Sequence, residues 1–104
     1  LSHGEQRQLE IAMSLATDPQ LLLLDEPLAG MGTEESSNMV DLICGLASNH
    51  AILLVEHDMD AVFRLAEVLT VMVNGKILAS GAPEAIRANQ EVQSAYLGSA
   101  DEFL

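Results

Sequence analysis

The fold is decided by one short stretch, Leu21-Leu22-Leu23-Leu24-Asp25-Glu26-Pro27. An uninterrupted apolar run of this length is too short for a helix and is typical of a central strand in a parallel sheet, covered on both faces. Asp25 and Glu26 end the run, and Pro27 begins a rigid turn. The stretch therefore predicts a buried strand that places two adjacent carboxylates at its carboxyl end.

The rest of the chain alternates helical and extended patterns around this strand. Helical patterns fall at 3–17, 33–47, 59–66 and from 83 to near 98, and further strand patterns fall at 51–55, 68–73 and 76–80. Asn74-Gly75 is a strong signal for a two-residue hairpin between the last two strands. This order predicts an α/β layered domain with a mainly parallel sheet, to which the hairpin adds an antiparallel edge. We expect one domain over 1–98 and a flexible tail over 99–104.

Some local features can be predicted as well. The first helix should be largely buried through a stripe formed by Leu9, Ala12, Met13 and Ala16, with Ile11 and Leu15 widening it. Thr33 is the expected N-cap of the second helix. His50 precedes its strand, at the edge opposite the strand ends, and is expected to be exposed and without a function.

Composition narrows the function classes. The chain of 104 residues carries 16 acidic and 4 basic residues, a formal net charge of −12, so nucleic acid and anionic lipid surfaces are repelled. A single cysteine, Cys44, excludes an intramolecular disulfide and fits a reducing cytosol, where such a residue usually packs as a small hydrophobe. No apolar run approaches the length of a membrane span.

The two strand-end carboxylates suit different tasks. A bare pair of acids at a strand end more often caps or solvates the chain than it catalyses. Asp25, however, stands where an aspartate can hold Mg²⁺ through its water shell beside nucleotide phosphates. Glu26 points elsewhere and could polarise an attacking water. His57 follows the next parallel strand at the same sheet edge, where a neutral imidazole could orient Glu26, the water and a phosphate together.

The chain opens on Leu1-Ser2-His3-Gly4-Glu5-Gln6, at the start of a helix. Ser2 and Glu5 have the spacing of a capping box, in which each side chain accepts from the other residue's backbone N–H, and the cap is worth about 1 kcal/mol. A helix N-terminus also offers unpaired N–H groups and a partial positive charge, and Gly4 permits close backbone approach. The same residues therefore predict both a cap and a phosphate site.

Together these motifs resemble those of ABC-type ATPases, the nucleotide-hydrolysing subunits of membrane transporters. Residues 21–27 resemble the family's extended Walker B motif, and His57 matches the switch-region histidine that contacts the γ-phosphate. Residues 1–6 resemble the signature motif LSGGQ in the variant found in branched-chain amino-acid importers. Residues 28–32 take the place of the D-loop, where Gly32 replaces the usual aspartate.

The resemblance implies a partial P-loop NTPase-like domain that uses ATP and Mg²⁺. It implies that Glu26 and His57 are catalytic, that Asp25 holds Mg²⁺ through water, and that Ser2 and Gly4 complete the ATP site of a partner subunit at the γ-phosphate. The implied partners are a second ATPase subunit, transmembrane permease subunits and, indirectly, a substrate-binding protein. The implied location is the cytoplasm, on the inner face of the cell membrane, and the implied cargo is branched-chain amino acids.

The residues also leave alternatives open. The chain starts on a motif at Leu1, and it contains neither the phosphate loop G-x-x-x-x-G-K-[ST] nor a glutamine loop, so we expect it to be part of a larger protein and inactive by itself. The intact protein could instead be a non-transport ABC ATPase, although such proteins usually carry coiled-coil insertions or basic surfaces. A non-catalytic regulatory module that retains the fold is the third reading.

Overall fold

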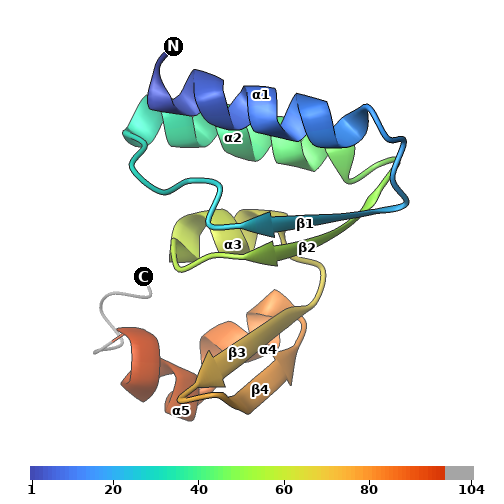
Figure 1. Ribbon diagram of the computed structural model, residues 1–104. Helices are drawn as coiled ribbons and strands as arrows, with labels where there is room; N and C mark the ends of the chain where they lie inside the picture. The colour runs from blue at the N-terminus through green and yellow to red at the C-terminus, as the bar shows by residue number, and fades with distance from the viewer. Residues whose placement is uncertain (98–104) are drawn as a thin grey trace. The chain divides into compact units, whose positions relative to one another are not determined.

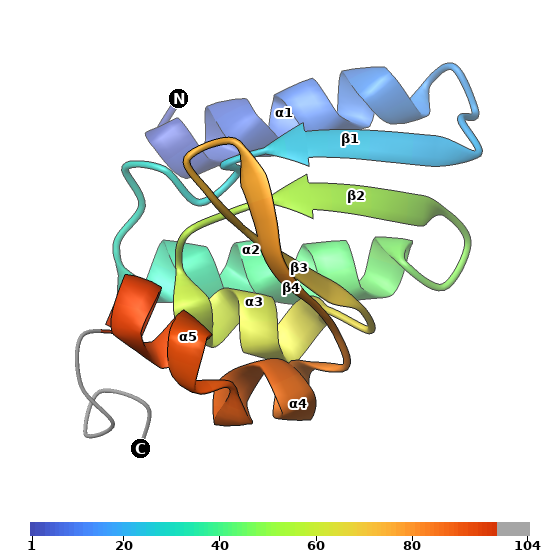
Figure 2. The same cartoon turned by 90° about the horizontal axis from the view of Figure 1, so that it is seen from below.

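The predicted strand pair forms as expected. In a computed structural model that describes residues 1–97, the leucine run becomes strand β1 (Leu21–Asp25), and its neighbour is β2 (Ala51–Val55). The strands pair in parallel, with Leu21 opposite Ala51 and Asp25 opposite Val55, and both arrows point the same way in Figure 2. Because parallel partners end at one edge, the residues that follow Asp25 and Val55 are brought together.

Helices α1 (His3–Leu15), α2 (Thr33–Leu46) and α3 (Met59–Leu65) complete the first compact unit, residues 1–65. Both α1 and α2 lie on the same side of the two strands (Figure 1). The buried core of this unit comprises Ile11, Leu28, Met39, Val40, Ile43 and Ala61. Half-buried Leu24 and Ile52 pack against this core, so one face of the strand pair is covered by helices.

The opposite face of the strand pair is open, which corrects the expectation that β1 is covered on both faces. Leu21 and Leu23 are 53% and 68% exposed, and Leu53 and Val55 are 59% and 56% exposed. Side chains alternate along a strand, and directly paired residues point to the same side, so these four form one apolar face. The apolar character of the run correctly predicted a parallel strand but not which elements cover it.

Helix α1 is also less buried than its sequence predicts. Leu9 is 50% exposed and Met13 is 66% exposed, whereas Gly4 and Ile11 are the buried residues of the helix. The helix turns the side that carries Gly4, Ile11 and half-buried Leu15 inward. Because α1 has apolar residues on two sides, helical periodicity alone selected the wrong stripe.

The structure corrects three further local expectations, which concern the N-cap of α2, Cys44 and His50. The N-cap of α2 is Gly32, with φ −76° and ψ 179°, and Thr33 is already helical, so the expected threonine cap does not form. Cys44 lies on the exposed side of α2, next to buried Ile43, and does not pack as a core residue. His50 is half-buried, and its Nδ1 lies 2.9 Å from the carbonyl oxygen of Pro19.

The second compact unit begins at Ala66 and contains a hairpin of β3 (Leu69–Val73) and β4 (Lys76–Gly81). Asn74 and Gly75 have φ values of 51° and 77°, the positive angles that a type I′ turn requires, which confirms the predicted hairpin. The hairpin forms a two-stranded sheet of its own and not an edge of the parallel sheet.

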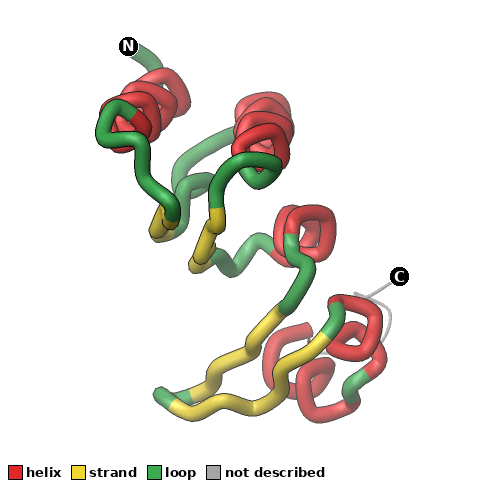
Figure 3. The backbone as a smooth tube through the Cα atoms, turned by 90° about the vertical axis from the view of Figure 1, so that its right-hand side faces the viewer, coloured by secondary structure: helices red, strands yellow, loops and turns green. Residues whose placement is uncertain are grey.

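After the hairpin come α4 (Pro83–Ala88), α5 (Gln90–Val92) and a π-helical turn η1 (Gln93–Leu97), which Figure 3 draws as red coils. Pro83 opens α4 as predicted, because its missing N–H is not needed there. Asn89, in extended conformation, interrupts the helical path and caps α5 through Val92 N–H. The expected tail 99–104 and the helix end near Gly98 lie outside the described residues. None of the helices within residues 1–97 has the length and apolar character that crossing a membrane demands.

Candidate functional site at the strand ends and the start of the first helix

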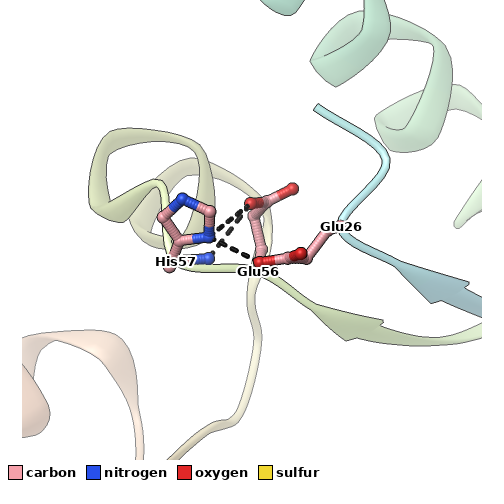
Figure 4. A group of neighbouring side chains, drawn as sticks. All are labelled: Glu26, Glu56 and His57. Atoms are coloured by element: carbon pink, nitrogen blue, oxygen red, sulfur yellow. Dashed lines mark hydrogen bonds and ion pairs between the residues drawn. The ribbon is translucent and has the colours of Figure 1, made fainter. Parts of the chain in front are cut away.

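The carboxyl ends of β1 and β2 bring two of the predicted site residues into contact. His57 Nδ1 lies 2.7 Å from Glu26 Oε1 (Figure 4). Glu26 has φ 46°, a left-handed conformation that is uncommon outside glycine, and its N–H donates to the Val55 carbonyl at 2.7 Å. The backbone therefore turns sharply where β1 ends, and the bond to β2 fixes the turn beside His57.

A third residue, Glu56, holds this arrangement together and was not predicted as a site residue. Its backbone is partly accessible, but its side chain is only 1% exposed. Glu56 Oε2 accepts from Leu28 N–H at 3.2 Å, and Oε1 accepts from His57 N–H at 3.0 Å. The buried carboxylate thus joins the loop after β1 to the loop after β2. We call Glu26, Glu56 and His57 the strand-end cluster.

The bond between His57 and Glu26 constrains the imidazole. A carboxylate accepts hydrogen bonds when it is ionised, and in that form of Glu26 this contact requires the proton on Nδ1. Figure 4 shows the second ring nitrogen on the side away from both carboxylates, and the His57 side chain is 74% exposed. Nε2 is therefore open to a ligand. It accepts a hydrogen bond when the ring is neutral and donates one when the ring is protonated.

The strand-end cluster has the donor set of a cation site. One carboxylate oxygen each from Glu26 and Glu56, together with an imidazole nitrogen of His57, lie within 4.8 Å of one another. Asp25, the residue predicted to hold Mg²⁺, is outside this group. It is the last residue of β1, exposed, and its partner is Val55, so it lies on the open face of the strand pair.

The remaining predicted residues, Ser2 and Gly4, lie at the start of α1. The capping box is present: Ser2 Oγ accepts from Glu5 N–H at 3.1 Å, and Glu5 Oε1 accepts from Ser2 N–H at 3.0 Å. The hydrogen bond from the Ser2 backbone, followed by that from the Ser2 hydroxyl, lowers the pKa of Glu5. This half of the sequence prediction, the structural one, is confirmed.

The N–H of Gly4, which a phosphate site would use, already has a partner. Glu35, in the first turn of α2, accepts it through Oε2 at 3.0 Å. A Cβ at residue 4 would collide with this carboxylate, so glycine is required for the contact as it stands. We call Ser2, Gly4, Glu5 and Glu35 the helix-start cluster. Sequence reasoning missed Glu35 because only the packing of α1 beside α2 brings it to Gly4.

The segment after β1 joins the two clusters. It begins at Glu26, passes Gly30 and reaches Glu35 in α2. Gly30, with φ 77°, lies against the His3 ring, because a Cβ placed there would stand 3.3 Å from two ring atoms. Residues 26–35 therefore link the end of β1 to the first turn of α2, where Glu35 contacts the start of α1.

Comparison with known proteins places these features in one family. Residues 1–29 match the family described as ABC transporter, and residues 76–102 match the family described as branched-chain amino acid ATP-binding cassette transporter. The first match contains Ser2, Gly4, Asp25 and Glu26, and the second begins at β4.

Individual relatives agree. The chain is 45% identical, over 102 residues and 96% of its length, to the high-affinity branched-chain amino acid transport ATP-binding protein LivG of Escherichia coli. It is equally similar to BraF of Pseudomonas aeruginosa, a protein of the same description. In both comparisons the chain spans 40% of the relative's length.

A solved structure agrees as well. The ADP conformation of MJ1267, an ATP-binding cassette of an ABC transporter, superposes with a TM-score of 0.82 at 30% identity, covering 95% of this chain and 41% of that one. The α/β fold with a parallel sheet and an antiparallel hairpin is thus shared with an ATP-binding cassette.

Proposed function

Because the chain belongs to the ATP-binding cassette family, we propose that the protein containing it hydrolyses ATP to power a membrane importer. The observation that carries the proposal is the contact of 2.7 Å between Glu26 and His57 at the carboxyl ends of two parallel strands. Ligands of parallel α/β sheets bind at this edge. Similarity to proteins that are described as ATP-binding supports the choice of nucleotide.

The residues present fit part of a nucleotide and metal site. The carboxylates and imidazole of the strand-end cluster are donors that suit a divalent cation, and Asp25 would hold Mg²⁺ through water. When bound, MgATP supplies the phosphoryl group that passes to water. Ser2 and Gly4 would complete the site of a second ATPase subunit at the γ-phosphate. The loop that cradles the triphosphate has no counterpart in these 104 residues.

Each member of the strand-end cluster has a distinct role in this proposal. Glu26 positions the attacking water and takes up its proton, because its carboxylate is partly exposed and its orientation is fixed by His57. His57 presents Nε2 to the γ-phosphate and donates to it when the ring is protonated. Glu56 acts through the other two, since its buried carboxylate holds the backbone N–H of His57.

Branched-chain amino acids are the proposed cargo. The support is the match of residues 76–102 to the branched-chain amino acid transporter family and the names of LivG and BraF. The proposed partners are a second ATPase subunit, permease subunits and, indirectly, a substrate-binding protein. The ATPase would work in the cytoplasm, on the inner face of the cell membrane.

Replacing Glu26 tests the proposal. In the full-length protein, Glu26→Gln should reduce ATP turnover by roughly 10²-fold or more while leaving ATP binding intact. Glu67→Gln, an exposed substitution with the same change of charge, is the matched control and should retain normal turnover. If Glu26→Gln hydrolyses ATP as fast as this control, the assignment of Glu26 is wrong.

We expect residues 1–104 alone to bind MgATP weakly and not to hydrolyse it. They contain no phosphate loop, and their net charge of −12 opposes the approach of a triphosphate. Isothermal titration calorimetry of the chain with MgATP should give no tight binding. Micromolar affinity would contradict this expectation.

A further inference from the structure

The first observation concerns charge at the start of α1. Helices α1 and α2 begin at the same end of the first unit (Figure 1), and Glu35 in the first turn of α2 accepts the Gly4 N–H at 3.0 Å. The carboxylate therefore lies at the N-terminal ends of two helices, where the partial positive charges of both stabilise an anion. Glu35 occupies the position that an external anion would seek.

The second observation is the shape of the surroundings. A cleft of about 140 Å³ opens beside this contact, and its lining includes Ser2, Gly4, Glu35 and Asn38. The cleft has polar side chains from both helices, and the Ser2 hydroxyl and the Gly4 backbone belong to residues that line it. These are the two groups that the proposed function assigns to the γ-phosphate of a partner subunit's nucleotide.

The third observation concerns the charged residues around the helix start. Arg7, the nearest basic residue along α1, is paired with Glu10 at 3.5 Å. Glu5, in the capping box, adds a second carboxylate at the same helix start. An approaching phosphate therefore meets two carboxylates, and one of them, that of Glu35, already holds the Gly4 N–H.

We propose that Glu35 is an internal competitor for the phosphate site, and that its carboxylate must leave the Gly4 N–H before α1 can accept a nucleotide phosphate. The proposal rests on the proposed function for the identity of the ligand. The segment that carries Glu35 starts at Glu26, and its Gly30 lies against the His3 ring at the start of α1. This segment is the route by which we link release of Glu35 to hydrolysis. Movement at the strand-end cluster would shift the segment that positions Glu35.

The matched variants are Glu35→Gln, Glu35→Ala and Glu34→Gln. Glu34 is the exposed neighbour of Glu35 in the same turn of α2, so Glu34→Gln changes the charge at the helix start without removing the acceptor of the Gly4 N–H. A difference between the Glu34 and Glu35 variants therefore reports the contact itself and not the general field of the acidic surface.

The first readout needs no nucleotide. Amide hydrogen exchange followed by NMR should show Gly4 N–H exchanging on the order of tenfold faster in Glu35→Ala, because a hydrogen bond to a charged group is lost. Glu34→Gln should leave the Gly4 exchange rate unchanged. Equal Gly4 exchange rates in Glu35→Ala and the unmodified protein would overturn the inference.

The second readout is the MgATP concentration that gives half-maximal turnover of the full-length protein. Removing the competitor should lower it several-fold in Glu35→Gln and leave it unchanged in Glu34→Gln. The same value in both variants, with unmodified protein active, would overturn the competitor role even if the amide readout succeeds. Absence of ATP turnover in the unmodified protein would instead refute the proposed function, while the amide exchange still decides whether Glu35 occupies the site.

Discussion

The two clusters of the first unit are held by carboxylates in opposite environments. Glu56, in the strand-end cluster, has a side chain that is 1% exposed and accepts from two backbone N–H groups. Glu35, in the helix-start cluster, is an exposed residue and accepts from one backbone N–H group, that of Gly4. A buried acceptor with two donors is costly to remove, whereas an exposed one can exchange its partner for water. The difference suggests a fixed scaffold at the strand ends and a releasable contact at the helix start.

The largest effect is expected at Glu56. Glu56→Ala leaves the N–H groups of Leu28 and His57 without their acceptor, so the free energy of unfolding should fall by about 2–3 kcal/mol. Urea denaturation followed by circular dichroism measures this loss. Glu67→Ala, at an exposed position, should change stability by less than about 0.5 kcal/mol. A small effect of Glu56→Ala would show that the strand-end cluster is no more fixed than the helix start.

Two glycines provide the next contrast. Gly45 is in the last turn of α2, and an added Cβ meets nothing within 4 Å, so Gly45→Ala should stabilise the protein by up to about 0.5 kcal/mol. Gly4→Ala places a Cβ against the end of the flexible Glu35 side chain, which must move away, and the loss of its hydrogen bond to the residue 4 N–H should destabilise the protein by about 1 kcal/mol.

A double-mutant cycle separates the collision from other effects at residue 4. In a Glu35→Ala background, Gly4→Ala should lose its penalty, because the group that it displaces is gone. Urea midpoints of the four proteins provide the cycle. Additive effects of the two substitutions would contradict the contact between Gly4 and Glu35.

Much of this arrangement follows from sequence, and the remainder depends on tertiary contacts. The pairing of β1 with β2 and the meeting of Glu26 with His57 were predictable, because polar residues that follow two adjacent parallel strands share one sheet edge. Glu56 was not selected, since its burial depends on Leu28 in another loop. The proposed roles of these residues in hydrolysis remain predictions.

The helix-start cluster shows the same division. The capping box was predictable from spacing alone, because its two bonds join residues three apart. Glu35 is 31 residues from Gly4, and no local pattern signals that contact. Likewise the stripe of Leu9 and Met13 was preferred to the inward side of α1 because apolar residues occur on both.

A smaller effect tests the local part of the helix-start cluster. Ser2→Ala removes the acceptor of Glu5 N–H and should cost about 1 kcal/mol of stability. Ser14→Ala is the control within the same helix. The Ser14 hydroxyl donates to the Glu10 carbonyl, a hydrogen bond that the helix does not need, so the stability of Ser14→Ala should be unchanged or slightly higher. Thermal or urea unfolding measures both. Equal losses in the two variants would mean that the cap contributes nothing specific.

The smallest expected effect is a pH dependence at Glu5. Its pKa is lowered in the folded state by the bonds to Ser2, so the native protein favours the ionised form more than the unfolded chain does. This contribution is present above the pKa of the unfolded glutamate and is lost as the pH falls through the lower, folded value. Glu5→Gln keeps an acceptor for Ser2 N–H but removes the charge. The difference in stability between the unmodified protein and Glu5→Gln should therefore shrink as the pH falls, which urea denaturation across this acid range can measure. A constant difference would assign the stabilisation to hydrogen-bond geometry and not to charge.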